Sequence, residues 1–71
     1  MEMEKYKAAI IDNATNEVVD VTMVRQGIEI PYDEENYRVK PCPEQAGIGF
    51  TEIDDVWSHP DVEETYTTPE L

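Results

Sequence analysis

The chain has 71 residues, 17 acidic and five lysine or arginine, which gives a formal net charge of −12 at neutral pH. A chain of this length forms one small domain with a thin hydrophobic core. Its negative charge disfavours direct binding to nucleic acid or to an anionic membrane, because both would repel it, and favours a basic partner.

Cysteine usage, the acidic N-terminal stretch and the length of the apolar runs indicate the cellular setting. The single Cys42 excludes an internal disulfide, on which small secreted domains usually depend. The acidic start "MEMEKYKAAIID" does not look like a signal peptide, and no apolar run has the length of a transmembrane helix. We therefore expect a cytoplasmic protein.

The first half of the chain predicts a β-hairpin. Residues 5–12 ("KYKAAIID") and 17–24 ("EVVDVTMV") are rich in strand-forming residues. Between them, residues 13–16 ("NATN") have the composition of a turn, because asparagine tolerates a left-handed backbone. The residues expected to alternate on one face of the second strand are Val19, Val21 and Met23.

Two further strands are expected between residue 28 and Lys40. In residues 28–32 ("IEIPY") the side chains of Ile28, Ile30 and Tyr32 alternate with those of the residues between them. Pro31 cannot donate a hydrogen bond to a neighbouring strand and therefore indicates an edge strand or a strand end. A turn over residues 33–36 ("DEEN") leads into residues 37–40 ("YRVK"). The result is an antiparallel meander of about four strands.

Beyond Lys40 the pattern changes. Prolines on both sides of Cys42 make residues 41–47 a boundary loop, and residues 48–50 ("IGF") are expected to form a short strand. After it, Ile53, Val56 and Trp57 have the i, i+3, i+4 spacing of a short helix.

Two pairs of residues support helices in this region. Thr51 with Asp54 and Ser58 with Asp61 have the spacing of capping boxes. The predicted fold class is therefore α+β: a single domain over residues 1–71, mostly antiparallel sheet, with one or two short helices near the C-terminus. The ends, residues 1–4 and 67–71, are expected to fray.

Catalytic and metal-binding patterns are weak. Ser58 and His59 are adjacent in sequence, which does not make a catalytic triad, and Ser58 is better explained as a helix cap. Cys42 lies in a proline-rich loop among acids, where its thiol pKa should be raised. The acid-rich stretches lack the spacing of a calcium loop, and Cys42 and His59 are the only soft ligands for zinc. We expect no enzymatic activity, no metal and no cofactor.

Charge asymmetry is the most informative feature of the sequence. Residues 41–71 hold eight acids and no lysine or arginine. Helix dipoles explain some acids in first turns, but not the missing cations, which normally alternate with surface glutamates. We therefore interpret the acids as a functional surface rather than as an aid to solubility. The residues expected to bind the partner are Asp33, Glu34, Glu35, Glu52, Asp54, Asp55, Asp61, Glu63 and Glu64.

Such a surface can imitate DNA. Duplex DNA carries one negative charge per about 1.7 Å of its axis, and same-face strand residues lie about 6.6 Å apart, which a partner's arginines and lysines can accept in place of phosphates. In size, acidity, absence of cysteine pairing and β-rich character, the chain resembles the short acidic host-takeover proteins of lytic phages that act as DNA mimics, most of all the phage inhibitors of the bacterial nucleoid protein HU. The resemblance implies that the protein fills the DNA-binding cleft of a basic, dimeric host protein in an infected bacterium.

Other functions stay open. The same charge suits a phage-type inhibitor of RNA polymerase or of another host enzyme, which would dock through a different surface. In a structural or assembly protein, the acidity would merely maintain solubility. The oligomeric state, a homodimer included, is not determined by the sequence.

Overall fold

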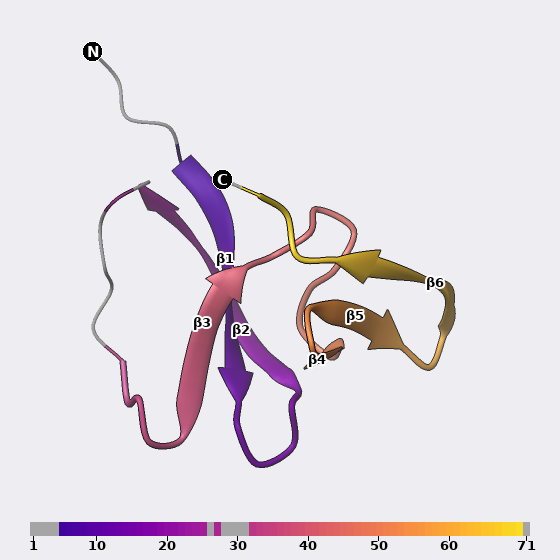
Figure 1. The fold of residues 1–71 in the computed structure, drawn as a ribbon, viewed down its shortest axis with the longest axis horizontal. Coiled ribbons are helices and arrows are strands. Elements are labelled where there is room, and N and C mark those ends of the chain that lie inside the picture. The colour runs from indigo at the N-terminus through magenta and orange to yellow at the C-terminus, as the bar shows by residue number, and fades with distance from the viewer. Residues whose placement is uncertain (1–4, 26, 28–31, 71) are drawn as a thin grey trace.

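The computed structural model describes residues 5–25, 27 and 32–70. These residues form six strands in two three-stranded antiparallel sheets (Figure 1). The first sheet, in the order β2-β1-β3, contains β1 (Lys5–Asp12), β2 (Val18–Arg25) and β3 (Tyr37–Pro41). The second sheet, in the order β4-β5-β6, contains β4 (Thr51–Ile53), β5 (Val56–His59) and β6 (Val62–Thr67).

The predicted N-terminal hairpin is confirmed by the antiparallel pairing of β1 with β2. Its turn is closed by a hydrogen bond from the Asn16 amide to the Asp12 carbonyl, at 2.7 Å, and Asn16 has a positive φ of 63°. The side chain of Asp12 also accepts a hydrogen bond from the Ala14 amide. The turn chemistry of asparagine and aspartate therefore fixes the hairpin register.

The predicted apolar face of the second strand is wrong at Val19, whereas Val21 and Met23 share one face opposite Ala9 and Lys7. The register shifts between Ile10 and Ile11, which pair with Asp20 and Val18, so that Val19 is an extra residue in β2. A β-bulge of this kind interrupts the alternation of side chains between the two faces. As a result Val18 is fully buried and Val19 is exposed.

Strand β3 pairs with β1 rather than continuing a simple meander, so that β1 is the central strand of the first sheet. Of the strand predicted over residues 28–32, residues 28–31 lie outside the described part of the chain. The last residue, Tyr32, is exposed and belongs to no strand.

The predicted helices near the C-terminus are wrong, and the described fold is all-β rather than α+β. The supposed capping boxes lie instead in two β-hairpins. Asp54 and Asp55 form the two-residue turn between β4 and β5 with positive φ angles of 51° and 67°, as a type I′ turn requires. Pro60 and Asp61 form the turn between β5 and β6. An i, i+3, i+4 pattern that spans a single turn cannot offset the cost of nucleating a helix, whereas these strands are closed by tight turns.

The short strand predicted over residues 48–50 is also wrong. The Phe50 amide donates to the Gly47 carbonyl at 3.1 Å, and Gly49 has a φ of 97°. This segment is a turn because its glycine adopts a left-handed backbone that few other residues tolerate. The strand begins one residue later, at Thr51.

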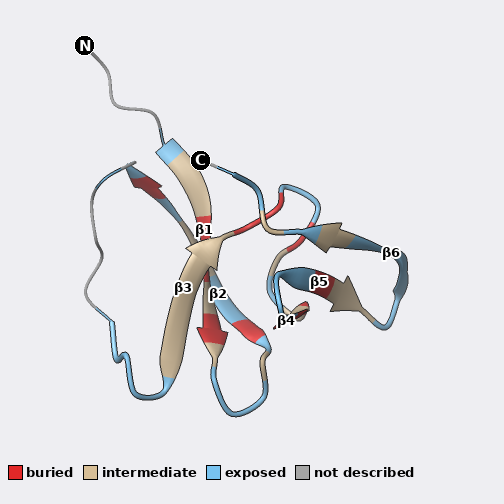
Figure 2. Ribbon diagram, in the orientation of Figure 1, coloured by how far each residue is buried: buried red, intermediate tan, exposed pale blue. Residues whose placement is uncertain are grey.

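A hydrophobic core lies between the two sheets. Trp57, at the centre of β5, is fully buried, and its indole N–H donates to the Thr68 hydroxyl at 2.9 Å. Backbone hydrogen bonds join the sheets where β2 begins: the Val18 amide donates to the Phe50 carbonyl, and the Glu52 amide to the Asn16 carbonyl. The buried core residues are Ala9, Ile11, Val18, Cys42, Ala46, Phe50 and Trp57 (Figure 2).

Candidate protein-binding surface

All five lysine and arginine residues of the chain lie on one face of the first sheet. Lys5 and Lys7 alternate along β1, and Arg38 and Lys40 alternate along β3 opposite Ile11 and Ala9. Cross-strand partners share a face, and side chains repeat every second residue. This is also the face that carries Ala9 and Ile11 into the core. The fifth cation, Arg25, pairs with Lys5 at the end of the sheet.

Two of these cations converge on the carboxylate of Glu52. One oxygen, Oε1, accepts hydrogen bonds from Arg38 Nη2 at 2.6 Å and from Arg38 Nε at 3.1 Å. The other, Oε2, accepts from Lys40 Nζ at 2.9 Å and from the Asp55 amide at 2.7 Å. Lys40 also bonds Asp55 Oδ1 at 2.9 Å. We call Arg38, Lys40, Glu52 and Asp55 the Glu52 cluster.

The Glu52 cluster is an internal structure and not part of the outer surface. The Glu52 side chain is 1% exposed. Burial by itself raises its pKa, but the hydrogen bonds from Lys40, Arg38 and the Asp55 amide outweigh burial and lower the pKa below its ordinary value. Lys40 has a raised pKa, mainly through its hydrogen bond to Asp55. Glu52, which the sequence places in the partner-binding set, therefore has both oxygens engaged within the protein.

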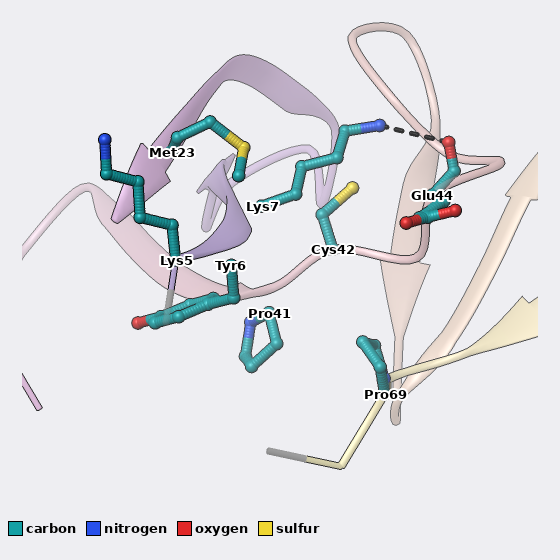
Figure 3. A pocket seen from close by; sticks show the side chains of 8 residues that line it. All are labelled: Lys5, Tyr6, Lys7, Met23, Pro41, Cys42, Glu44 and Pro69. Carbon is teal, nitrogen blue, oxygen red and sulfur yellow. Dashed lines mark hydrogen bonds between the residues drawn. The ribbon is translucent and has the colours of Figure 1, made fainter. Parts of the chain in front are cut away.

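A third cation, Lys7, is also directed inward. Its ammonium donates to the carbonyl oxygens of Glu44 and Ala46 in the loop after β3. It lies at a hollow of about 570 Å³ where β3 ends, beside the buried Cys42 (Figure 3). Burial raises the pKa of the Cys42 thiol, and the charge of Lys7 opposes this only in part, so the predicted raised pKa is confirmed.

The predicted acids of the first sheet lie on an ordered turn. Asp33, Glu34 and Glu35 are all exposed in the turn before β3. Asp33 accepts hydrogen bonds from the Asn36 side chain at 2.7 Å and from the Glu35 amide at 3.1 Å, and the Asn36 bond is the main cause of its lowered pKa. These bonds hold the turn in one conformation, so its carboxylates project from a defined backbone.

Hydrogen bonds connect this acidic turn to the one between β4 and β5. The Asn13 amide donates to the Asn36 carbonyl, and the Asn13 side chain accepts from Arg38 Nη1 at 2.9 Å. Arg38 in turn bonds Glu52, whose carboxylate holds the Asp55 amide. The turn over residues 33–36 and the turn at Asp54 and Asp55 are therefore connected by one hydrogen-bond network, in which Asp55 remains 65% exposed.

The remaining predicted acids lie on the third hairpin. Asp61 is exposed in the β5–β6 turn, where its amide donates to His59 Nδ1 at 3.0 Å. Glu63 and Glu64 are exposed neighbours in β6, where the register with β5 shifts. His59, the last residue of β5, packs against the Phe50 ring with the two ring centroids 5.2 Å apart and the ring planes tilted by 45°.

The exposed carboxylates follow the length of the molecule rather than forming one compact patch. The turn over residues 33–36 and the β5–β6 turn lie toward opposite ends of the longest axis (Figure 1). The residues that we call the acidic set are Asp33, Glu34, Glu35, Asp54, Asp55, Asp61, Glu63 and Glu64, all of them exposed.

The structure also shows an apolar feature that the sequence interpretation missed. Ile53 and Val56 are 55% and 43% exposed and pair across β4 and β5. Trp57 and Glu52, the neighbouring pair, point to the core, so Ile53 and Val56 lie on the outer face of the second sheet. The sequence signal was present, because "TEIDDVW" alternates on either side of a two-residue turn.

Other classes of site find little support in the described residues. Among residues 5–25, 27 and 32–70, no group of three or more histidine, cysteine, aspartate and glutamate side chains is placed to hold a metal ion. The same part of the chain contains no helix of the length and hydropathy needed to cross a bilayer. Comparisons with protein-family models, with curated proteins and with solved structures gave no match.

Proposed function

We propose that this protein binds a basic DNA-binding protein through its anionic exterior and thereby prevents that partner from binding DNA. One observation carries the proposal: three of the five cations are directed inward, whereas eight of the nine acids predicted to bind a partner are directed outward. Arg38, Lys40 and Lys7 donate to oxygens of the protein itself, whereas the acidic set is exposed.

The arrangement of the acidic set suits an elongated basic groove. Carboxylates distributed along the molecule, on ordered turns and on β6, offer a partner a series of anions, as a phosphate backbone does. A defined backbone at these positions lowers the conformational entropy that binding would cost. The partner suggested by the resemblance to phage DNA mimics is the nucleoid protein HU, in the cytoplasm of an infected bacterium.

A competition experiment tests this proposal. Purified HU is bound to a fluorescent DNA duplex, and the protein is added at salt concentrations from 50 to 200 mM. We expect displacement of the DNA, with an affinity for HU that falls at least about tenfold over this range, because binding releases counterions. If the protein leaves the DNA bound to HU at the lowest salt concentration, HU is not the partner.

The variants must spare the Glu52 cluster. Charge reversal at Glu52 or Asp55 would disturb the contacts with Arg38 and Lys40 and would test folding rather than binding. The triple variant Asp61→Asn/Glu63→Gln/Glu64→Gln removes three exposed charges, and we expect it to bind HU roughly tenfold more weakly. The double variant Thr65→Val/Thr67→Val on the same strand is the matched control and should bind like the parent protein.

The exposed pair Ile53 and Val56 favours a second candidate function, the inhibition of RNA polymerase or another host enzyme through an apolar contact. Binding of this kind should be nearly independent of salt. Ile53→Ser should then abolish inhibition, while the triple charge variant should leave it unchanged. The opposite pattern supports competition with DNA.

A further inference from the structure

The outer edge of β6 is an open strand edge. β6 lies at the end of the order β4-β5-β6 and pairs with β5, and no other strand in the described part of the chain pairs along its second edge. Most of its residues are exposed (Figure 2). Such an edge presents unpaired amide and carbonyl groups to any extended chain that reaches it.

The register shows which backbone groups face this edge. Tyr66 pairs with Trp57, and the Thr68 amide donates to the Asp55 carbonyl at 3.0 Å, so the backbone groups of Tyr66 and Thr68 are directed toward β5. Successive residues of a regular strand direct these groups to alternate sides. The amide and carbonyl of Thr67, which lies between Tyr66 and Thr68, are therefore directed outward, away from β5. Before Tyr66 the register with β5 shifts, so the alternation does not extend to Thr65.

There is space beside this edge for another strand. A hollow of about 550 Å³ lies along it, with Thr65, Tyr66 and Thr67 on one side. The opposite wall is the loop formed by Pro43, Glu44 and Gln45, and Pro69 lies at the end.

The other strand edges are less suitable. Strand β4 has three residues, β3 ends at Pro41, and the start of β2 is hydrogen-bonded to Phe50. Strand β6 has six residues and contains neither proline nor lysine, the residues that most often protect an edge.

We propose that an extended, basic segment of the partner protein adds to the second sheet as a fourth strand along β6. This inference rests on the proposed function and specifies how the partner is bound. Charge complementarity argues for a basic segment, because Glu44, Glu63 and Glu64 border the edge and residues 41–71 contain no lysine or arginine. A second copy of this chain would place its own β6 glutamates against them, and like charges across a strand pair are destabilising.

Probe peptides test the requirement for backbone pairing. The probe is the acetylated and amidated peptide Lys-Val-Lys-Val-Lys-Val, and its control is the same peptide methylated at its two central backbone nitrogens. Two consecutive methyl groups block both edges of the peptide while keeping its charge. We expect the parent peptide to perturb the NMR amide signal of Thr67 most, and the methylated peptide to bind at least about tenfold more weakly. Equal binding of the two peptides overturns the proposal.

A protein variant makes the same test from the other side. Thr67→Pro removes an outward-facing N–H without removing a hydrogen bond to β5, and proline is tolerated on a strand edge in this orientation. Thr67→Val keeps the N–H and is the matched control. We expect Thr67→Pro to lose peptide binding at least about tenfold and Thr67→Val to retain it. Slow amide exchange at Tyr66 verifies that β5 and β6 remain paired.

The outcomes separate this proposal from the proposed function. Salt-sensitive peptide binding that is unaffected by Thr67→Pro and by methylation overturns the strand addition and leaves the anionic surface intact. Absence of any peptide binding also overturns the strand addition, while competition with DNA for HU tests the proposed function independently. Sedimentation that shows dimers lost in Thr67→Pro would assign the edge to a second copy and overturn the basic occupant.

Discussion

The two sheets carry opposite charges, and the contrast explains how a chain with five cations and 17 acids folds. The first sheet holds every lysine and arginine on the face that packs against the second sheet. The second sheet, over residues 51–67, has six acids and no lysine or arginine. The Glu52 cluster joins the sheets where their charges meet, which leaves the other acids of the second sheet on its exterior.

The contrast shows that a sheet without lysine or arginine can have a buried carboxylate neutralised by cations of the other sheet. A buried ion pair gains net stability only when its geometry is good and its remaining polar atoms are satisfied. Both oxygens of Glu52 meet this condition with four donors. No buried side-chain nitrogen or oxygen atom in the described residues lacks a hydrogen-bond partner.

Removing the central carboxylate should have the largest effect. Glu52→Ala leaves Arg38 and Lys40 without their shared partner, and we expect a loss of about 3–5 kcal/mol in the free energy of unfolding, measured by urea denaturation. This is a large part of the stability of so small a domain. Glu63→Ala removes an exposed glutamate from the same sheet and should cost no more than about 0.5 kcal/mol. Equal midpoints for the two variants would show that the sheets are not joined through Glu52.

Changing the geometry of the cation should have a smaller effect. In Arg38→Lys the charge remains. A lysine cannot, however, reproduce the hydrogen bonds to the side chains of Asn13 and Asn16 and to the carbonyl and Oε1 oxygens of Glu52. We expect a loss of about 1.5–3 kcal/mol by the same measurement. Arg25→Lys, at an exposed position, is the matched control and should be neutral. Identical losses in the two variants would contradict a role for the arginine geometry.

Acid should weaken the contact between the sheets without any mutation. The pKa of Glu52 in the folded protein is below its ordinary value of 4.5, so its contribution is fully present above the unfolded pKa. The contribution is lost as the pH falls through the lowered pKa. Urea midpoints measured from pH 7 to pH 3 should therefore decrease mainly below about pH 4.5. The decrease should be shallower in Glu52→Gln, and an unchanged slope in that variant would assign the pH dependence to other acids.

The smallest effect is expected within the second sheet alone. Asp54 has a φ of 51°, which costs about 1–2 kcal/mol for a residue with a side chain, whereas glycine adopts it freely but loses more entropy on folding. We expect Asp54→Gly to stabilise the protein by about 0.5 kcal/mol. Asp61→Gly, at a turn position without a positive φ, should give no gain. A destabilised Asp54→Gly would mean that the carboxylate has a structural role of its own.

The sequence predicted local features well and long-range ones poorly. The strand over residues 5–12 and its hairpin were predictable, because alternation and asparagine turn chemistry act over a few residues. The bulge at Val19 was not, since it depends on how β2 meets its neighbours. In the C-terminal third, Ile53, Val56 and Trp57 satisfied a helical spacing by chance, and the turn at Asp54 and Asp55 was misread as a helix cap.

Eight of the nine acids predicted to bind a partner are exposed, and the ninth could not have been recognised from the sequence. Glu52 is followed within three residues by Asp54 and Asp55 and has the same local composition. Its burial depends on Arg38 and Lys40, which are 14 and 12 residues away.

By itself, the sequence determined the size of the domain, the antiparallel hairpin at its start and the concentration of uncompensated acids after Lys40, because composition and short-range spacing are properties of the chain. Only the tertiary structure decided that β1 lies between β2 and β3, that all the cations share one face and that Glu52 is internal while its neighbours face the solvent. The reason is physical: an acid is buried only where cations from other strands meet it, and strand pairing brings them there.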